Sequence, residues 1–198
     1  MRRTKPRRRT PRSLPDHIRP GARVLFIGIN PGLRSAEVGH HFAGHSNRFW
    51  RLMHESRLLP EHVTCEDDAR LPEFGFGITN LIRRATAGID SLRAEEYARG
   101  RRALLARIKS CRPEVVALVG VTVYRALFAT SSSRGTRQTA PHTRTSHPFR
   151  LGMQRETLAG TRIFVLPNPS GRNATVSYDA MLAAFRRLKR HLDGRGRG

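Results

Sequence analysis

Two segments at opposite ends of this chain share one pattern, a short apolar run followed by Asn-Pro and a small residue. Residues 23–32 read RVLFIGINPG and residues 162–171 read RIFVLPNPSG. Such runs predict buried strands, and proline moves the preceding asparagine away from helical conformation. Each strand should therefore end in a rigid turn that holds an asparagine, Asn30 or Asn168. If the strands are parallel neighbours, both turns open at the sheet edge where α/β proteins bind ligands.

Strand and helix patterns alternate along the chain from Gly21 onward. Short apolar strands that alternate with amphipathic helices predict a mainly parallel sheet covered on both faces, an α/β fold. Residues 130–148 are polar and rich in turn formers, which predicts a long loop. The predicted strands are 23–29, 74–79, 114–119 and 162–166, and the predicted helices are 46–58, about 90–111, 121–129 and about 177–193.

The chain is strongly basic, with 37 Lys+Arg against 15 Asp+Glu in 198 residues and a formal net charge of +22. This charge predicts attraction to polyanions, with nucleic acid the leading candidate. Residues 1–20 combine arginines with four prolines, which is typical of a disordered basic tail. We expect this tail to contact phosphates, with a solubilising leader as the alternative, and we place the folded domain at residues 21–194.

Several classes of protein are disfavoured by what the chain lacks. Cys65 and Cys111 have neither disulfide-framework nor zinc-site spacing. His40, His41 and His45 share a loop without the further ligands that a tetrahedral metal site needs, so no metal is expected. Asn-Pro interrupts the glycine-rich loop that a dinucleotide-binding protein would need. No apolar run reaches membrane-spanning length and no secretory signal is present, so we expect a cytoplasmic, nucleoid-associated protein.

The residues near the two turns restrict the chemistry that such a site could perform. No nucleophile–base arrangement and no paired carboxylates accompany the turns, so asparagines and backbone amides must suffice. An amide is no general base, but it can orient a water molecule. Hydrolysis of an N-glycosidic bond suits such a site, because the bond can break largely before water attacks. Phe42 lies in a polar loop and is either a core residue or a platform on which a nucleobase stacks.

From about Arg23 to Leu192, the sequence resembles the mismatch-specific uracil/thymine DNA glycosylases of the uracil-DNA glycosylase superfamily. The resemblance is carried by GINPG at 28–32, FAGHSNRFW at 42–50, GITNLIRRAT at 77–86 and NPSG at 168–171. It implies a three-layer α/β/α sandwich with a short, mainly parallel central sheet. It also implies a monofunctional enzyme without cofactor or metal that acts as a monomer on double-stranded DNA containing G:U or G:T mismatches.

The resemblance further implies individual roles. Asn30 would position the water that attacks the sugar, the Ile29 backbone would bind the uracil edge, and Phe42 would stack on the flipped base. His41 and Ser35 would border the base pocket. The loop that enters the duplex and contacts the opposite guanine would comprise Asn168, Ser170, Gly171, Arg172, Asn173 and Ala174. Arg172 and Asn173-Ala174 depart from the bacterial pattern, which has leucine and Ser-Arg at these positions.

The sequence therefore predicts a DNA glycosylase that removes uracil opposite guanine. A wider form of this hypothesis adds thymine and other damaged bases opposite guanine to the substrates. The enzyme would leave an abasic site for base excision repair. No lysine lies near either motif, which disfavours a Schiff-base lyase step. The alternative is a nucleic-acid-binding protein of the same fold with no catalysis or with altered specificity, and a nucleotide-binding α/β enzyme is a weaker third candidate.

Overall fold

The computed structural model describes residues 13–128 and 151–194. In these residues five strands form one sheet in the order β2-β1-β3-β5-β4. Strand β4 pairs antiparallel with β5, and all other neighbours pair in parallel. The strands are β1 (Val24–Gly28), β2 (Phe76–Asn80), β3 (Val115–Val119), β4 (Gly152–Leu158) and β5 (Thr161–Leu166).

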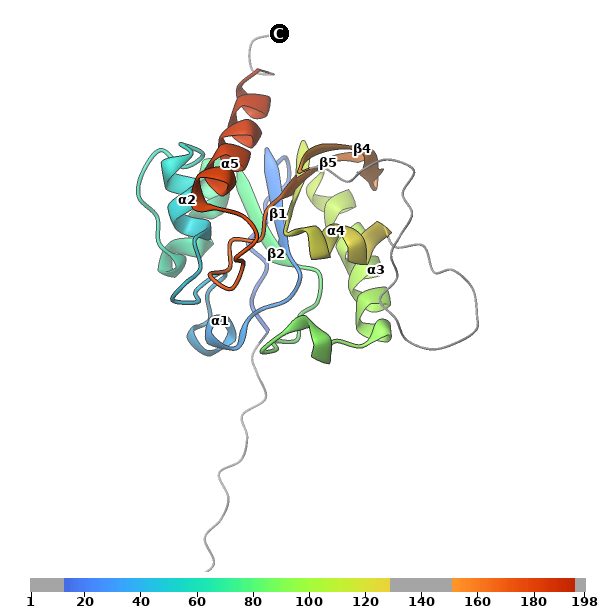
Figure 1. Cartoon of the computed structure of the whole chain (residues 1–198). Helices are drawn as coiled ribbons and strands as arrows, with labels where there is room; N and C mark the ends of the chain where they lie inside the picture. Colours follow the sequence, from blue (N-terminus) through green and yellow to red (C-terminus); the bar gives the residue numbers. More distant parts are fainter. Residues whose placement is uncertain (1–12, 129–150, 195–198) are drawn as a thin grey trace, which may run out of the picture.

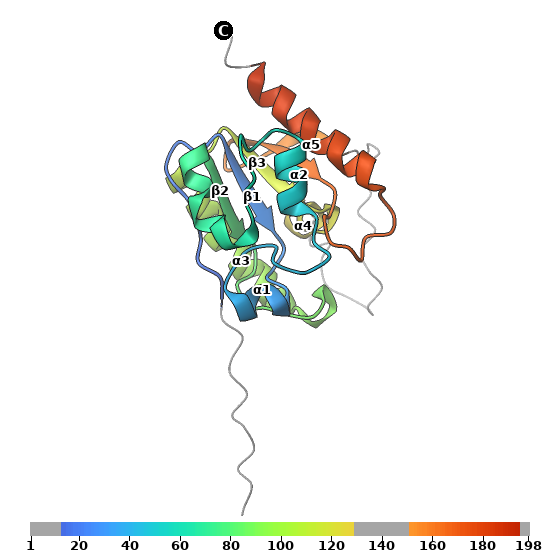
Figure 2. The same ribbon diagram turned by 90° about the vertical axis from the view of Figure 1, so that its left-hand side faces the viewer.

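Helices cover both faces of this sheet, as Figures 1 and 2 show. Helices α2 (Phe49–Glu55) and α5 (Tyr178–Asp193) lie on one face, and α3 (Ala94–Cys111) and α4 (Val121–Phe128) lie on the other. Shorter pieces are α1 (Leu33–Val38), η1 (Cys65–Phe74) and η2 (Ile89–Ser91). The predicted three-layer α/β/α sandwich with a mainly parallel sheet is therefore confirmed.

The two cores follow from the alternation of side chains along each strand. All five residues of β1 are buried, because one set faces each layer of helices. Phe26 packs with Phe49 of α2 and Phe185 of α5, whereas Leu25 packs with Leu104 of α3. The parallel strands thus read as continuous apolar runs, which is the pattern that the sequence displays.

Two details of the sheet differ from the prediction. Strand β3 lies between β1 and β5, so the strands that carry the Asn-Pro turns are parallel but are not neighbours. Both turns still open at the same edge of the sheet. Strand β4 was not predicted, because it is an edge strand whose residues are mostly exposed and polar. The predicted loop 130–148 lies outside the described residues.

Residues 13–20, which were assigned to a disordered tail, instead pack against the domain. His17 exchanges two backbone hydrogen bonds with Ile78 of β2, at 3.1 and 2.8 Å, and Leu14 is buried. The side chain of Asp16 accepts a hydrogen bond from Thr79 and forms an ion pair with Arg107 at 2.8 Å. The folded domain therefore begins before residue 21, and residues 1–12 of the predicted tail lie outside the described residues.

Within residues 13–128 and 151–194, no helix has the length and apolar character needed to cross a membrane.

Candidate active site

A cavity of about 500 Å³ opens at the carboxyl ends of the parallel strands. The turns after β1 and β5, the end of β2 and the segment after β3 all contribute to its wall. The cavity therefore lies where side chains from neighbouring βα connections converge, which is the usual ligand site of α/β sheets. Asn30, Ile29, Phe42, His41, Ser35, Asn168, Ser170 and Arg172, all predicted from the sequence, line this single cavity.

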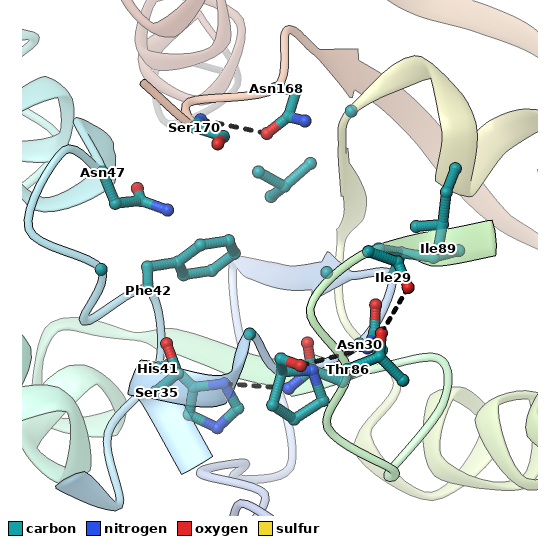
Figure 3. Close-up of a pocket in the computed structure, with 18 of the residues that line it drawn as sticks. Ile29, Asn30, Ser35, His41, Phe42, Asn47, Thr86, Ile89, Asn168 and Ser170 are labelled. Carbon is teal, nitrogen blue, oxygen red and sulfur yellow. Dashed lines mark hydrogen bonds between the residues drawn. The ribbon is translucent and has the colours of Figure 1, made fainter. Parts of the chain in front are cut away.

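Asn30 is held by its amide nitrogen. Nδ2 donates hydrogen bonds to Thr86 Oγ1 at 2.8 Å, to the carbonyl of Pro31 at 3.0 Å and to the carbonyl of Arg84 at 3.1 Å. Within the described residues no donor reaches the other end of the amide, Oδ1. The side chain is therefore fixed with a hydrogen-bond acceptor available to a ligand or a water molecule. Figure 3 shows Asn30 and Thr86 together on one side of the cavity.

The segment that holds Asn30 is itself firmly braced. Thr86 Oγ1 donates to the carbonyl of Gly88 at 2.7 Å, so its lone pairs face the Asn30 amide. The guanidinium of Arg84 binds the Glu96 carboxylate through two hydrogen bonds, at 2.7 and 2.8 Å. These bonds, with one from the Arg93 backbone, lower the pKa of Glu96 to about 2. Thr86 and the Arg84 carbonyl are therefore held in place, and they in turn hold the Asn30 amide.

Phe42 projects toward the cavity from the opposite side (Figure 3). One face of its ring stacks on Phe49 with centroids 4.2 Å apart and planes inclined by 19°. Its φ of 53° is unusual for a bulky residue, and such strain persists only where the surroundings enforce it. Ser35 helps to enforce it, because Ser35 Oγ accepts a hydrogen bond from the backbone of Ala43 at 3.0 Å. Phe42 therefore packs on the core through one face and also lines the cavity, so its position fits both of its predicted roles, and base stacking stays a prediction.

His41 is only 1% exposed, so it supports the wall more than it borders the open space. Its Nε2 lies 2.9 Å from the carbonyl of Pro15, which can only accept, so Nε2 carries a proton. Burial lowers the pKa of His41 below its ordinary value of 6.5, so the ring is neutral at neutral pH. Nδ1 therefore accepts a hydrogen bond from Nδ2 of Asn80, at 3.3 Å. A neutral imidazole thus fixes which way the Asn80 amide faces.

Asn80 is a site residue that the sequence analysis missed. It ends β2 and lines the cavity, and its Oδ1 lies close to Gly28, where an added Cβ would stand 2.6 Å away. The signal was present in the sequence, because Asn80 ends the run FGFGITN just as Asn30 and Asn168 end theirs. Thr86 was also missed. No local pattern connects Thr86 to Asn30, which lies 56 residues earlier.

A buried carboxylate, Asp68, ties the N-terminal segment to the wall of the cavity. Its Oδ2 accepts from the backbone of His41 at 2.7 Å, and its Oδ1 lies 3.1 Å from His40 Nδ1 and 3.3 Å from His17 Nε2. His17, His41 and Asp68 are residue types that bind metals, and their ligating atoms lie within 4.8 Å of one another. Both ring nitrogens of His41 nevertheless have hydrogen-bond partners, Pro15 and Asn80. The cluster therefore links the N-terminal segment to the loop that carries His41.

The loop after β5 is held by its own polar groups. Asn168 Oδ1 accepts from the backbone of Ser170 at 3.0 Å, and Asn173 Nδ2 donates to the Asn168 carbonyl at 2.9 Å. Gly171 touches Ser46, and a Cβ at position 171 would overlap the Ser46 side chain. Ala174 is exposed at the end of this loop. The Arg172 guanidinium donates to the Ala87 carbonyl at 3.1 Å, across the cavity mouth.

Ile29 continues directly from β1 into this site. Its carbonyl accepts a hydrogen bond from the backbone of Ile82 at 2.9 Å. This hydrogen bond ties the end of β1 to the segment after β2, and the contact of the Ile29 backbone with a base edge stays a prediction. The Asn47 side chain accepts a hydrogen bond from the Phe49 backbone at 3.0 Å, just before α2, whose N-cap residue is Arg48.

Fold and cavity together define a three-layer α/β protein with a polar, amide-lined site at its strand ends. The family model of the uracil DNA glycosylase superfamily matches residues 15–189. The chain therefore belongs to the uracil DNA glycosylase superfamily, whose members are DNA glycosylases. The match begins at residue 15, which agrees with the packed N-terminal segment.

A solved structure supports the same fold. The solution NMR structure of a Methanosarcina acetivorans protein, provisionally assigned as a uracil DNA glycosylase, matches with a TM-score of 0.58 and 17% sequence identity. The match covers 93% of this chain and 99% of that chain.

Proposed function

We propose that this protein is a monofunctional DNA glycosylase that hydrolyses the N-glycosidic bond of uracil paired with guanine. The observation that carries the proposal is the Asn30 amide, whose nitrogen is fixed by three acceptors while Oδ1 remains available opposite the Phe42 ring. A flat base that stacks on Phe42 would bring its sugar toward Asn30.

In this mechanism Asn30 Oδ1 accepts a hydrogen bond from a water molecule and so directs a lone pair of the water oxygen toward the sugar C1′. The C1′–N1 bond breaks, and its electron pair leaves with the base. The water oxygen then bonds to C1′ and loses a proton, which balances the proton taken up by the departing base. Asn30 acts by position and not as a base, because an amide does not take up the proton.

Asn80 supports recognition of uracil over cytosine. Because its Nδ2 donates to neutral His41, its Oδ1 presents an acceptor. Uracil carries a proton on N3, which such an acceptor binds, whereas cytosine has no N3 proton. The arrangement would leave a buried acceptor unsatisfied against cytosine, and mismatched polar groups of this kind discriminate strongly.

Specificity for mismatches rests on different observations. A mispaired base is extruded from the stack at lower cost than a paired one. The exposed Arg172 at the cavity mouth supplies donors for an opposite guanine, and arginine suits the O6 and N7 acceptors of that base. The thymine methyl changes binding by only a few kcal/mol at most, so thymine opposite guanine belongs among the substrates to be tested. Lys109 and Lys189, the two lysines within residues 13–128 and 151–194, do not line the cavity, which favours hydrolysis without a lyase step.

The test uses labelled duplexes that contain one G:U, A:U, G:T or G:C pair, with the full-length protein in excess. We expect alkali-labile abasic sites to form fastest at G:U and not at G:C. Strand cleavage without alkali would contradict the monofunctional assignment, and equal rates at A:U and G:U would contradict mismatch specificity. Tight binding to G:U duplex without base release would instead support the non-catalytic alternative.

A further inference from the structure

Among the described residues, three large apolar side chains stand out as exposed: Leu33 at 51%, Ile89 at 38% and Met153 at 38%. Single exposed apolar residues are ordinary on protein surfaces. Two of these three, however, line the same cavity, whereas Met153 lies on the edge strand β4. Because Leu33 and Ile89 are both exposed at the same cavity, we ask what partner could cover them there.

The backbone brings the two side chains to neighbouring loops. Gly32 and Thr86 form a parallel bridge, and the Thr86 N–H donates to the Pro31 carbonyl at 3.1 Å. Leu33 follows Gly32 directly, and Ile89 follows Thr86 by three residues. Figure 3 shows Ile89 beside the segment that holds Asn30. We call Leu33 and Ile89 the apolar rim.

The loop that carries Ile89 is fixed. Ser91 Oγ donates to the Gly88 carbonyl at 3.1 Å, and the Leu92 N–H donates to the Ile89 carbonyl at 3.0 Å. Arg84 reaches the Ser91 carbonyl at 2.7 Å while it also binds Glu96. An apolar side chain on so rigid a support stays exposed to water and is suited to contact a partner without further ordering of the loop.

The loop predicted to enter the duplex lacks such a side chain. Residues 168–174 read NPSGRNA, without a large apolar residue. Proteins that unstack DNA frequently insert leucine, isoleucine, methionine or phenylalanine between base steps. The Arg172 side chain of that loop contacts Ala87, two residues before Ile89. The apolar rim and Arg172 thus meet at one place on the cavity mouth.

We propose that Leu33 and Ile89 pack against the unstacked bases and deoxyriboses beside the extruded nucleotide, so that the wedge of this protein is shared between Arg172 and the apolar rim. This inference rests on the proposed function and identifies which part of the DNA the rim contacts. Nucleic acid is the partner that fits, because the chain carries +22 charges and the exposed Arg34 and Arg172 flank the rim.

The test compares affinities of the full-length protein for two duplexes at one salt concentration. One duplex carries guanine opposite 2′-fluoro-2′-deoxyuridine, whose fluorine resists cleavage of the glycosidic bond, and the other is fully matched. The ratio of the two dissociation constants measures the preference for an extrudable base. We compare Leu33→Ser and Ile89→Ser with Met153→Ser, a control whose original side chain is as exposed as Ile89 but lies away from the cavity.

Each rim variant should lower the ratio about fivefold, as expected when a partly exposed apolar side chain that DNA covers is removed. Ile89→Leu should keep the wild-type ratio, Met153→Ser should leave it within twofold, and all variants should keep the wild-type melting temperature. A high wild-type ratio that neither serine variant lowers would overturn the inference alone. Equal weakening of both duplexes would overturn it too, because the rim would then contact DNA irrespective of base extrusion. A wild-type ratio near one would overturn the proposed function and this inference with it.

Discussion

Thr86 offers a sharp test of how Asn30 is positioned. The buried Thr86 hydroxyl accepts from Asn30 Nδ2 at 2.8 Å and donates to the Gly88 carbonyl at 2.7 Å. Thr86→Val keeps the shape of the side chain but removes both hydrogen bonds. Two polar groups lose a partner, and each loss costs about 1–3 kcal/mol in a buried setting. Asn30 keeps its bonds to Pro31 and Arg84, so the amide should loosen but not leave the site.

The expected consequence is a slower chemical step with little change in DNA affinity. A loss of about 1.4 kcal/mol in transition-state stabilisation corresponds to a tenfold slower rate. We therefore expect single-turnover release of uracil from G:U duplex to slow by roughly 10- to 100-fold. The dissociation constant for the fluorinated duplex should change by less than about threefold, because both hydrogen bonds of the hydroxyl are made to groups of the protein.

Thr86→Ser is the matched control, since it retains the hydroxyl and should excise uracil within about threefold of the wild-type rate. Melting temperatures separate this effect from general destabilisation. The reasoning would be refuted if Thr86→Val, folded at the assay temperature, released uracil as fast as Thr86→Ser.

Three further predictions concern the wall of the cavity. Gly171→Ala should lower G:U excision at least tenfold, because the added methyl collides with Ser46 and shifts the loop; a wild-type rate would mean that loop position is unimportant. Phe42→Ala should weaken binding of the fluorinated duplex by about 1–3 kcal/mol through lost base stacking, measured by fluorescence anisotropy against the matched duplex. Because burial depresses the pKa of His41 below 6.5, the unfolded state binds the proton more tightly, and stability should fall as pH drops through 6.5. Protonation of His41 Nδ1 would also place two donors, this N–H and the Asn80 Nδ2 group, against each other. In the His41→Gln variant the melting temperature should therefore fall less between pH 7.5 and 5.5 than in the wild type. An equal fall in both proteins would contradict this prediction.

Local sequence patterns were sufficient for the parallel part of the fold. β1 and β3 are buried along their whole length, as β5 is from Ile163 to Leu166, so each contains an unbroken apolar run that identifies a strand without reference to its neighbours. Strand β4 pairs with one neighbour only and has mostly exposed, polar residues, so its sequence lacks the apolar run by which a strand is recognised. Helix α1 has six residues, too few to display a helical period.

Some residues of the candidate site could likewise be predicted from local sequence, whereas others depend on contacts between distant segments. Asn30 and Asn168 were visible because a strand and a proline define their positions locally. The contacts that make Asn30 useful come from Arg84 and Thr86, more than 50 residues away, and no periodicity encodes them. The same limit applies to Asp68, which gathers histidines from two distant segments, and to the packing of Leu14.

The central claim is that the neutral Asn30 amide orients the attacking water. Its most direct test is single-turnover excision from G:U duplex by Asn30→Ala, purified in parallel with the wild type, together with the dissociation constant for the fluorinated duplex. Loss of a positioned water should slow excision at least about 100-fold while the dissociation constant stays within about threefold. Excision by Asn30→Ala at the wild-type rate would contradict the claim.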